Sequence, residues 1–130
     1  RIVQERRDHP LTTTAELARL IVHAVPSVAR HGRIQPATRV FQALRMAVND
    51  ELGALEALLG SLPSLLNPGA RAVIITFHSL EDRLVKHAFV QGARDGAWTV
   101  LTKKPVRPGE EEVGRNPRAR SAKLRAIERA

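Results

Sequence analysis

A long stripe of apolar residues is the clearest pattern in this 130-residue chain. Its members are spaced 3, 4, 4, 3, 4 and 3 apart: Phe41, Leu44, Val48, Leu52, Leu55, Leu59 and Leu62. Such spacing places them all on one face of an α-helix. We therefore predict a helix that begins near Ala37, directly after Pro36, and continues to about Leu59 or beyond.

The residues before this stripe also favour helices. A first helical stretch covers residues 1–9 and ends at His9, because a residue that precedes proline is pushed out of the helical conformation. Thr13 and Glu16 form a capping-box pattern, and the helix that they open should continue to the next proline. Residues 27–36 are predicted to form a basic loop.

The second part of the chain has an α/β pattern. The apolar run Ala72–Thr76 predicts a buried strand, and a helix from about Leu80 to Gln91 follows it. Trp98–Leu101 predicts another strand, and residues 103–118 should form a long polar loop. The tail, residues 121–129, is ambiguous, because its propensities favour a helix while its weak alternation favours a strand.

The first of these strands runs directly into a polar and charged cluster, Phe77–Arg83. Ligands of open α/β sheets bind at the carboxyl ends of the strands, so His78, Ser79 and Arg83 are candidate substrate-binding residues. The same segment also fits a helix N-terminus, with Ser79 as N-cap and Asp82 three residues later. A hydrolase site on adjacent His78 and Ser79 is disfavoured, because neighbouring side chains on an extended chain point to opposite faces.

Charge adds a partner class to this picture. The formal net charge is +8, and the isoelectric point is about 11.4. Residues 1–39 carry seven Lys/Arg against three Asp/Glu, and residues 103–130 carry nine against four, while the centre is nearly neutral. Two basic ends favour a polyanionic partner, most simply nucleic acid. The alternative is that the charge serves solubility alone.

Composition excludes several classes of site. The chain has no cysteine, so a disulfide framework and a thiolate metal site are both excluded, which fits a reducing cytoplasm. The five histidines show no convincing metal-ligand spacing. No apolar run and no leader pattern indicates membrane insertion or secretion, so a cytoplasmic location is expected.

Four segments, in order, carry a family resemblance: residues 31–45 (HGRIQPATRVFQALR), 48–52 (VNDEL), 77–83 (FHSLEDR) and 110–125. Together they resemble the MraW/RsmH family, bacterial S-adenosylmethionine-dependent methyltransferases that modify N4 of a cytosine in small-subunit ribosomal RNA. The resemblance covers essentially the whole chain, so it is far more specific than one short motif.

The resemblance implies an α/β fold: the C-terminal part of a Rossmann-like methyltransferase sheet plus a helical insertion domain. Residues 1–66 would form the helical insertion, which helps to recognise RNA, and residues 67–130 the last strands and helix of the sheet. The tail would then be a strand paired with the one around Trp98. The family's S-adenosylmethionine loop and its cytosine-holding motif precede this segment, so no cofactor-binding or catalytic residue is assigned here. The segment alone is expected to be inactive.

Candidate RNA-binding residues follow from charge and position. Guanidinium groups bind phosphates in a bidentate manner, which favours the basic tail. On the long helix, polar residues three and four apart share a face away from the apolar stripe. The candidates are Arg118, Arg120, Lys123 and Arg125 in the tail, and Thr38, Arg39, Gln42, Arg45 and Asn49 on the helix. A solvated basic surface is the alternative interpretation for both sets.

Two other functions remain as alternatives. One is a non-catalytic RNA-binding module derived from the same fold, with small-subunit ribosomal RNA or the ribosomal subunit as partner in either case. The other, a helix-turn-helix DNA binder on residues 12–25, is disfavoured because the following connection is long and bounded by prolines. A sheet lacking its other strands would expose apolar faces and edges, so a homodimer or swapped oligomer is expected.

Overall fold

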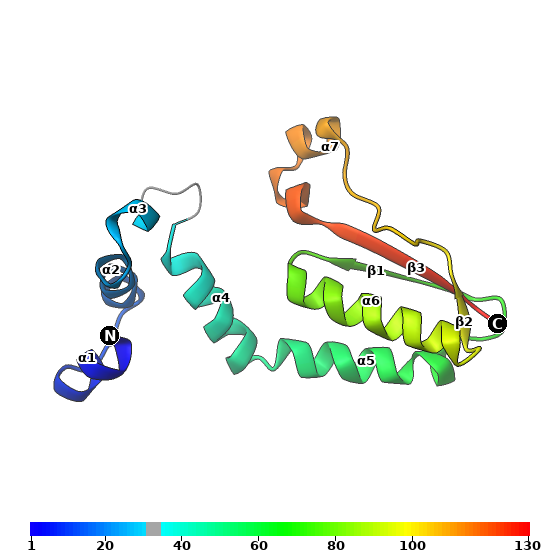
Figure 1. Ribbon diagram of the computed structural model, residues 1–130, viewed down its shortest axis with the longest axis horizontal. Coiled ribbons are helices and arrows are strands. Elements are labelled where there is room, and N and C mark those ends of the chain that lie inside the picture. Colours follow the sequence, from blue (N-terminus) through cyan, green and yellow to red (C-terminus); the bar gives the residue numbers. More distant parts are fainter. Residues whose placement is uncertain (31–34) are drawn as a thin grey trace. The chain divides into compact units, whose positions relative to one another are not determined.

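The chain folds as two compact units, residues 1–51 and residues 52–130, in a computed structural model that describes residues 1–30 and 35–130 (Figure 1). The boundary predicted between residues 66 and 67 stays a prediction. No helix in the described ranges combines the length and the apolarity needed to cross a membrane.

Helices make up the first unit: α1 (Ile2–Asp8), α2 (Thr14–Ala24), α3 (Ser27–Arg30) and α4 (Ala37–Val48). The capping box of α2 is confirmed. Thr13 Oγ1 accepts from the backbone N–H of Glu16 at 3.2 Å, and the Glu16 carboxylate accepts from the N–H of Thr13 at 2.9 Å. The loop predicted for residues 27–36 is a wrong prediction at residues 27–30, which form helix α3. Residues 31–34 of the predicted loop lie outside the described part of the chain.

The long helix predicted for the apolar stripe is interrupted, so one continuous helix is a wrong prediction. α4 ends at Val48, and α5 covers Glu51–Leu65. Between them Asp50 has a φ of 47°, in the left-handed region that aspartate tolerates better than most residues. The stripe is divided as a result: Leu59 and Leu62 are buried, whereas Val48 is 82% exposed.

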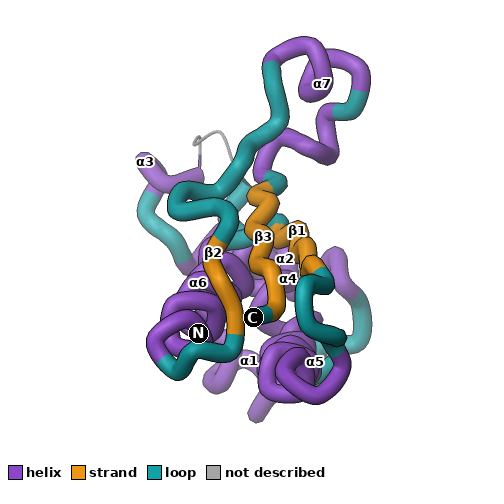
Figure 2. The backbone as a smooth tube through the Cα atoms, turned by 90° about the vertical axis from the view of Figure 1, so that its right-hand side faces the viewer, coloured by secondary structure: helices purple, strands orange, loops and turns teal. Residues whose placement is uncertain are grey.

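The second unit is built on a three-stranded sheet whose strands are, in spatial order, β1 (Arg71–Thr76), β3 (Lys123–Arg129) and β2 (Trp98–Val100). β3 lies in the middle and is antiparallel to both neighbours, so β1 and β2 run parallel to each other (Figure 2). The ambiguous tail is therefore a strand. Its expected pairing with the strand around Trp98 is confirmed, because Trp98 lies opposite Arg129.

Strand β1 is covered on one face only. Ala72 and Ile74 pack against the core, whereas Val73 and Ile75 are 57% and 54% exposed on the opposite face. Phe77, just beyond the strand, is also more than half exposed. The prediction of a buried strand is thus wrong for this face. β1 is also an edge strand, since β3 is its one pairing neighbour among the described residues.

Helix α6 (Ser79–Arg94) connects β1 to β2 and packs on the sheet. The core of this unit is one cluster of buried side chains from α5, α6, β2 and β3: Leu59, Leu62, Val85, Phe89, Trp98 and Ile127. The indole N–H of Trp98 donates to the backbone carbonyl of Phe89 at 2.9 Å, which satisfies the polar atom of this buried ring.

The loop predicted over residues 103–118 contains a short helix, α7 (Glu110–Arg115), followed by a 3₁₀ turn at Pro117–Ser121. Three glutamates occupy the first turn of α7, where carboxylates complement the helix dipole. Arg115 pairs with Glu111 at 3.0 Å. Favourable electrostatics therefore outweigh the glycines and prolines that predicted a loop.

Candidate functional site at the carboxyl end of strand β1

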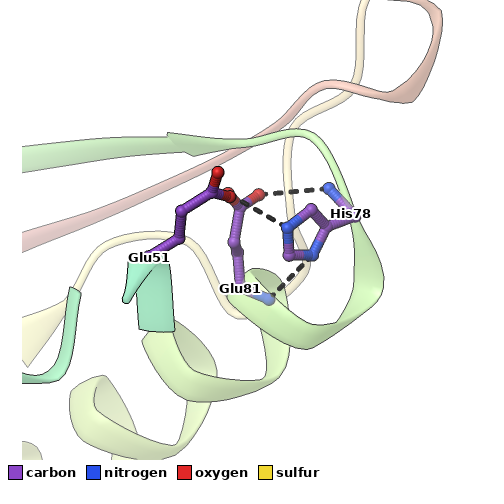
Figure 3. A group of neighbouring side chains, drawn as sticks. All are labelled: Glu51, His78 and Glu81. Carbon is purple, nitrogen blue, oxygen red and sulfur yellow. Dashed lines mark hydrogen bonds and ion pairs between the residues drawn. The ribbon is translucent and has the colours of Figure 1, made fainter. Parts of the chain in front are cut away.

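His78 caps helix α6 immediately after strand β1. Its Nδ1 accepts from the backbone N–H of Glu81 at 3.3 Å, while Glu81 Oε2 accepts from the backbone N–H of His78 at 3.2 Å (Figure 3). The predicted cap of Ser79 with Asp82 is therefore wrong by one residue. The reason is the backbone: His78 is still extended, with φ −138° and ψ 168°, so Ser79 already belongs to the helix.

The cap also defines the protonation pattern of the imidazole. Because Nδ1 is an acceptor, the neutral ring carries its proton on Nε2. Nε2 lies 3.2 Å from Glu81 Oε1, close enough for electrostatic attraction but not aligned as a hydrogen bond. The side chain is only 14% exposed. Both ring nitrogens of His78 thus face groups of Glu81, and the buried Nε2 is not accessible to a ligand.

Asp82 ties the first turn of α6 to strand β3. Its two carboxylate oxygens accept from Arg125 Nε at 2.8 Å and from Lys123 Nζ at 3.0 Å. Burial alone would raise the pKa of Asp82, but the hydrogen bonds and positive charges of Arg125 and Lys123 outweigh it and lower that pKa below its ordinary value. Lys123 and Arg125, both predicted to bind RNA phosphates, are therefore engaged inside the protein.

Arg118 and Arg120 project from the 3₁₀ turn that precedes β3. Asn116 Oδ1 accepts from the backbone N–H of Arg118 at 3.3 Å, and buried Ala119 anchors the turn between the two arginines. Both guanidinium side chains are exposed. Ser79 and Arg83, at the start of α6, are exposed as well. All four side chains are thus accessible to a ligand.

The predicted polar face of the long helix lies on α4 in the first unit. Arg39 is exposed and Gln42 is half-buried. Arg45 forms a two-pronged ion pair with Glu51, at 2.7 and 3.1 Å, and Asn49 donates to the same carboxylate at 3.4 Å. Part of the predicted face is therefore engaged at the junction between α4 and α5.

Sequence reasoning missed the residues of a cleft beside α6. Lys86, Val90 and Arg94 line it from that helix, at spacings that repeat on one helical face. This spacing is the sequence pattern that could have indicated the cleft. It does not stand out, because charged residues on an amphipathic helix usually belong to its solvated face.

Six of the described glycines give no sign of a preformed loop for S-adenosylmethionine. Such a loop needs glycines that let the backbone approach the ligand closely. A side chain built on Gly60, Gly69, Gly96, Gly109 or Gly114 would meet only open space. At Gly92 the space is filled by the ring of Trp98. We therefore derive no step that uses this cofactor.

Comparison with known proteins places these features in one family. The model of the MraW methylase family matches residues 1–130. A ribosomal RNA small subunit methyltransferase H from Synechococcus sp. (strain JA-2-3B'a(2-13)) is 62% identical over 121 residues, which are 93% of this chain and 37% of that protein. The same-named protein of Acidobacterium capsulatum is 57% identical over 123 residues, or 95% of this chain and 41% of its own length.

A third relative of the same name, from Rippkaea orientalis, is 57% identical over 129 residues and is covered to 40%. The chain thus spans about two fifths of the length of the curated relatives that it matches. Identities at this level over nearly the whole chain, together with a family match from end to end, leave one assignment: the chain belongs to the MraW methylase family.

Proposed function

We propose that this chain is the substrate-facing C-terminal segment of a cytoplasmic methyltransferase that transfers a methyl group from S-adenosylmethionine to N4 of a cytosine in small-subunit ribosomal RNA. The observation that carries the proposal is the agreement of the family match with the sheet. β1 and β2 run parallel and are joined by helix α6, the kind of unit from which Rossmann-like sheets are built.

The chemistry explains what such a segment must supply. The lone pair of cytosine N4 is delocalised into the ring, so the enzyme has to hold the amine in line with the methyl donor and accept hydrogen bonds from it. The base usually leaves its stack to reach the pocket, which requires a firm hold on the flanking phosphates. The exposed Arg118, Arg120 and Arg83 are suited to that hold.

His78 has a positioning role in this proposal. Its imidazole caps helix α6 through Glu81, and its Nε2 is buried. His78 would therefore hold in place the first turn of α6, which carries the exposed Arg83, rather than contact RNA itself. Partners of the protein would be small-subunit ribosomal RNA or the ribosomal subunit.

A chimera tests the proposal. The matched segment of the Synechococcus relative is replaced by this chain, and tritiated methyl transfer to small-subunit ribosomal RNA is measured, with nucleoside mass spectrometry to identify the product. The expected product is N4-methylcytidine. The relative without its matched segment is the negative control. A chimera that folds and binds S-adenosylmethionine but methylates no RNA, or another base, contradicts the proposal.

A second candidate is a non-catalytic RNA-binding module. The charge of +8 favours it. It predicts that the chain alone binds RNA as tightly as the chimera does, and that the chimera transfers no methyl group.

A further inference from the structure

A cleft of about 410 Å³ lies between helix α6 and the end of strand β2, within the second unit. Its floor is apolar, formed by Phe89, Val90, Ala93 and Val100. Four cationic residues complete the lining: Lys86, Arg94, Lys103 and Arg125. The volume falls in the range of pockets that hold one small ligand, roughly 300–1,000 Å³.

The charge of this cleft has one sign. Every ionisable residue of its lining is a cation, and the only one neutralised within the described chain is Arg125, which pairs with Asp82 at 2.8 Å. No ion pair is found for Lys86, Arg94 or Lys103 among the described residues, and all three are exposed. An apolar floor below three uncompensated cations suits a ligand with a flat apolar body and an anionic end.

We propose that this cleft binds one nucleotide of single-stranded RNA, with its base against Val90 and Val100 and its phosphate at Lys86 and Arg94. The inference rests on the proposed function, which makes RNA the polyanion that the protein meets. Thr102 adds a directional group. Its Oγ1 accepts from the backbone N–H of Ala126 at 2.9 Å, so its hydroxyl proton is left to donate to a base oxygen or nitrogen.

The position of the cleft indicates which nucleotide it would hold. After β2 the chain runs alongside β3 as far as Val106, which pairs with Leu124. Leu124 is next to Lys123, the first residue of β3, and Lys123 lies opposite Thr76 at the end of β1. Arg125 lines the cleft and also binds Asp82 in the first turn of α6. Rigid elements thus connect the cleft to the capped end of β1, so its nucleotide would be one that flanks the target cytosine.

Fluorescence anisotropy with a labelled single-stranded RNA 12-mer of mixed sequence tests the inference on the whole 130-residue chain. Lys86→Glu/Arg94→Glu should weaken binding at least tenfold and reduce the log–log salt slope by about 0.7, the value for one phosphate contact on a single strand. Lys104→Glu/Arg107→Glu makes the same change of net charge outside the cleft, and therefore measures the effect of charge alone.

A steric variant tests the apolar part. Val90→Trp fills the cleft without changing its charge, and it should weaken binding severalfold with an unchanged salt slope. Val106→Trp, at another exposed valine outside the cleft lining, is its matched control. Circular dichroism verifies that each variant is folded. Equal losses in a cleft variant and its matched control overturn the inference.

The outcomes separate this inference from the proposed function. If the unmodified chain binds no RNA, the inference is wrong, and the proposed function is then decided by the methyl transfer of the chimera alone. If it binds RNA and only Arg118→Glu/Arg120→Glu weakens the complex, the proposed function stands and the cleft is not a nucleotide site. If the cleft variants alone are defective relative to their controls, both stand.

Discussion

Gly92 of helix α6 lies directly against the indole of Trp98 from strand β2. A Cβ atom on residue 92 would overlap Cζ2 and Cε2 of that ring. The ring cannot easily retreat, because its N–H is bonded to the carbonyl of Phe89 and it meets the Phe89 ring edge-to-face at 6.2 Å. Helix and sheet therefore approach each other closely because this residue has no side chain.

Gly92→Ala should consequently destabilise the protein, although alanine is the better helix former. Overpacking of a core typically costs about 1–3 kcal/mol, which exceeds the gain of about 1 kcal/mol in helix propensity. Gly60→Ala in helix α5 is the matched control, because a methyl group there meets open space and should stabilise. Urea unfolding followed by Trp98 fluorescence measures both variants, and a stabilising Gly92→Ala would refute the close packing.

Asp82→Asn should destabilise the protein at neutral pH by about 1–2 kcal/mol, because it weakens two charge-assisted hydrogen bonds at a partly buried site. The folded-state pKa of Asp82 lies below the ordinary value of 3.8. The stabilisation is therefore complete above about pH 4 and is lost as the pH falls through the folded-state pKa. Urea unfolding at neutral and acidic pH should show the variant and the parent converging in acid. Asp95→Asn, at an exposed aspartate, is the control.

Two substitutions can separate the capping role of His78 from an effect on RNA binding. His78→Ala removes the cap and should cost about 1 kcal/mol of unfolding free energy, whereas His78→Asn keeps a good N-cap residue and should cost much less. Because Nε2 is buried, His78 should affect RNA binding only by holding the first turn of α6. RNA affinity should therefore fall in His78→Ala and be largely kept in His78→Asn, and equal losses in the two variants would contradict this positioning role.

The uncovered face of β1 should cause self-association of the chain. Val73 and Ile75 expose apolar surface on a strand with a free edge, which is a template for pairing with another copy. Val73→Lys/Ile75→Lys should shift sedimentation velocity profiles toward the monomer. Leu58→Lys, at an exposed leucine of α5, should not. A parent chain that sediments as a monomer at all concentrations contradicts this prediction.

The two arginines of the 3₁₀ turn should act through phosphates. Arg118→Glu/Arg120→Glu is expected to weaken RNA binding and to lower the salt slope by about 1.4. The weakening should be nearly independent of RNA sequence, because phosphate contacts carry no sequence information. An unchanged slope would exclude both side chains from the RNA interface.

The sequence was most informative where one local rule acted without a competitor. The box at Thr13 and Glu16 predicted the start of α2, and the apolar run before Phe77 predicted β1. The tail needed more, because its local preferences conflict and its strand exists only by pairing with two distant segments. There the family resemblance supplied what propensity could not.

The failures have specific causes. Helical periodicity continues through Asp50, so nothing in the apolar pattern signals a single residue in the left-handed conformation. Histidine is an uncommon N-cap, so Ser79 and Asp82 were the natural choices. The two hydrogen bonds of the Asp82 carboxylate, with Lys123 and with Arg125, join residues that are 41 and 43 positions apart. Only the register of β3 brings these residues together. For that reason the sequence alone favours an RNA contact for Lys123 and Arg125 rather than a contact inside the protein.

The central place of β3 has a consequence for biosynthesis. The residues of β1 pair with partners 47 to 57 positions later in the chain. At ribosomal speeds of about 5–20 residues per second, β1 is synthesised some 2–11 seconds, by rough estimate, before β3. During that interval β1 lacks the strand with which it pairs among the described residues. The pairing of β1 with β3 should therefore be a late step in the folding of the nascent chain.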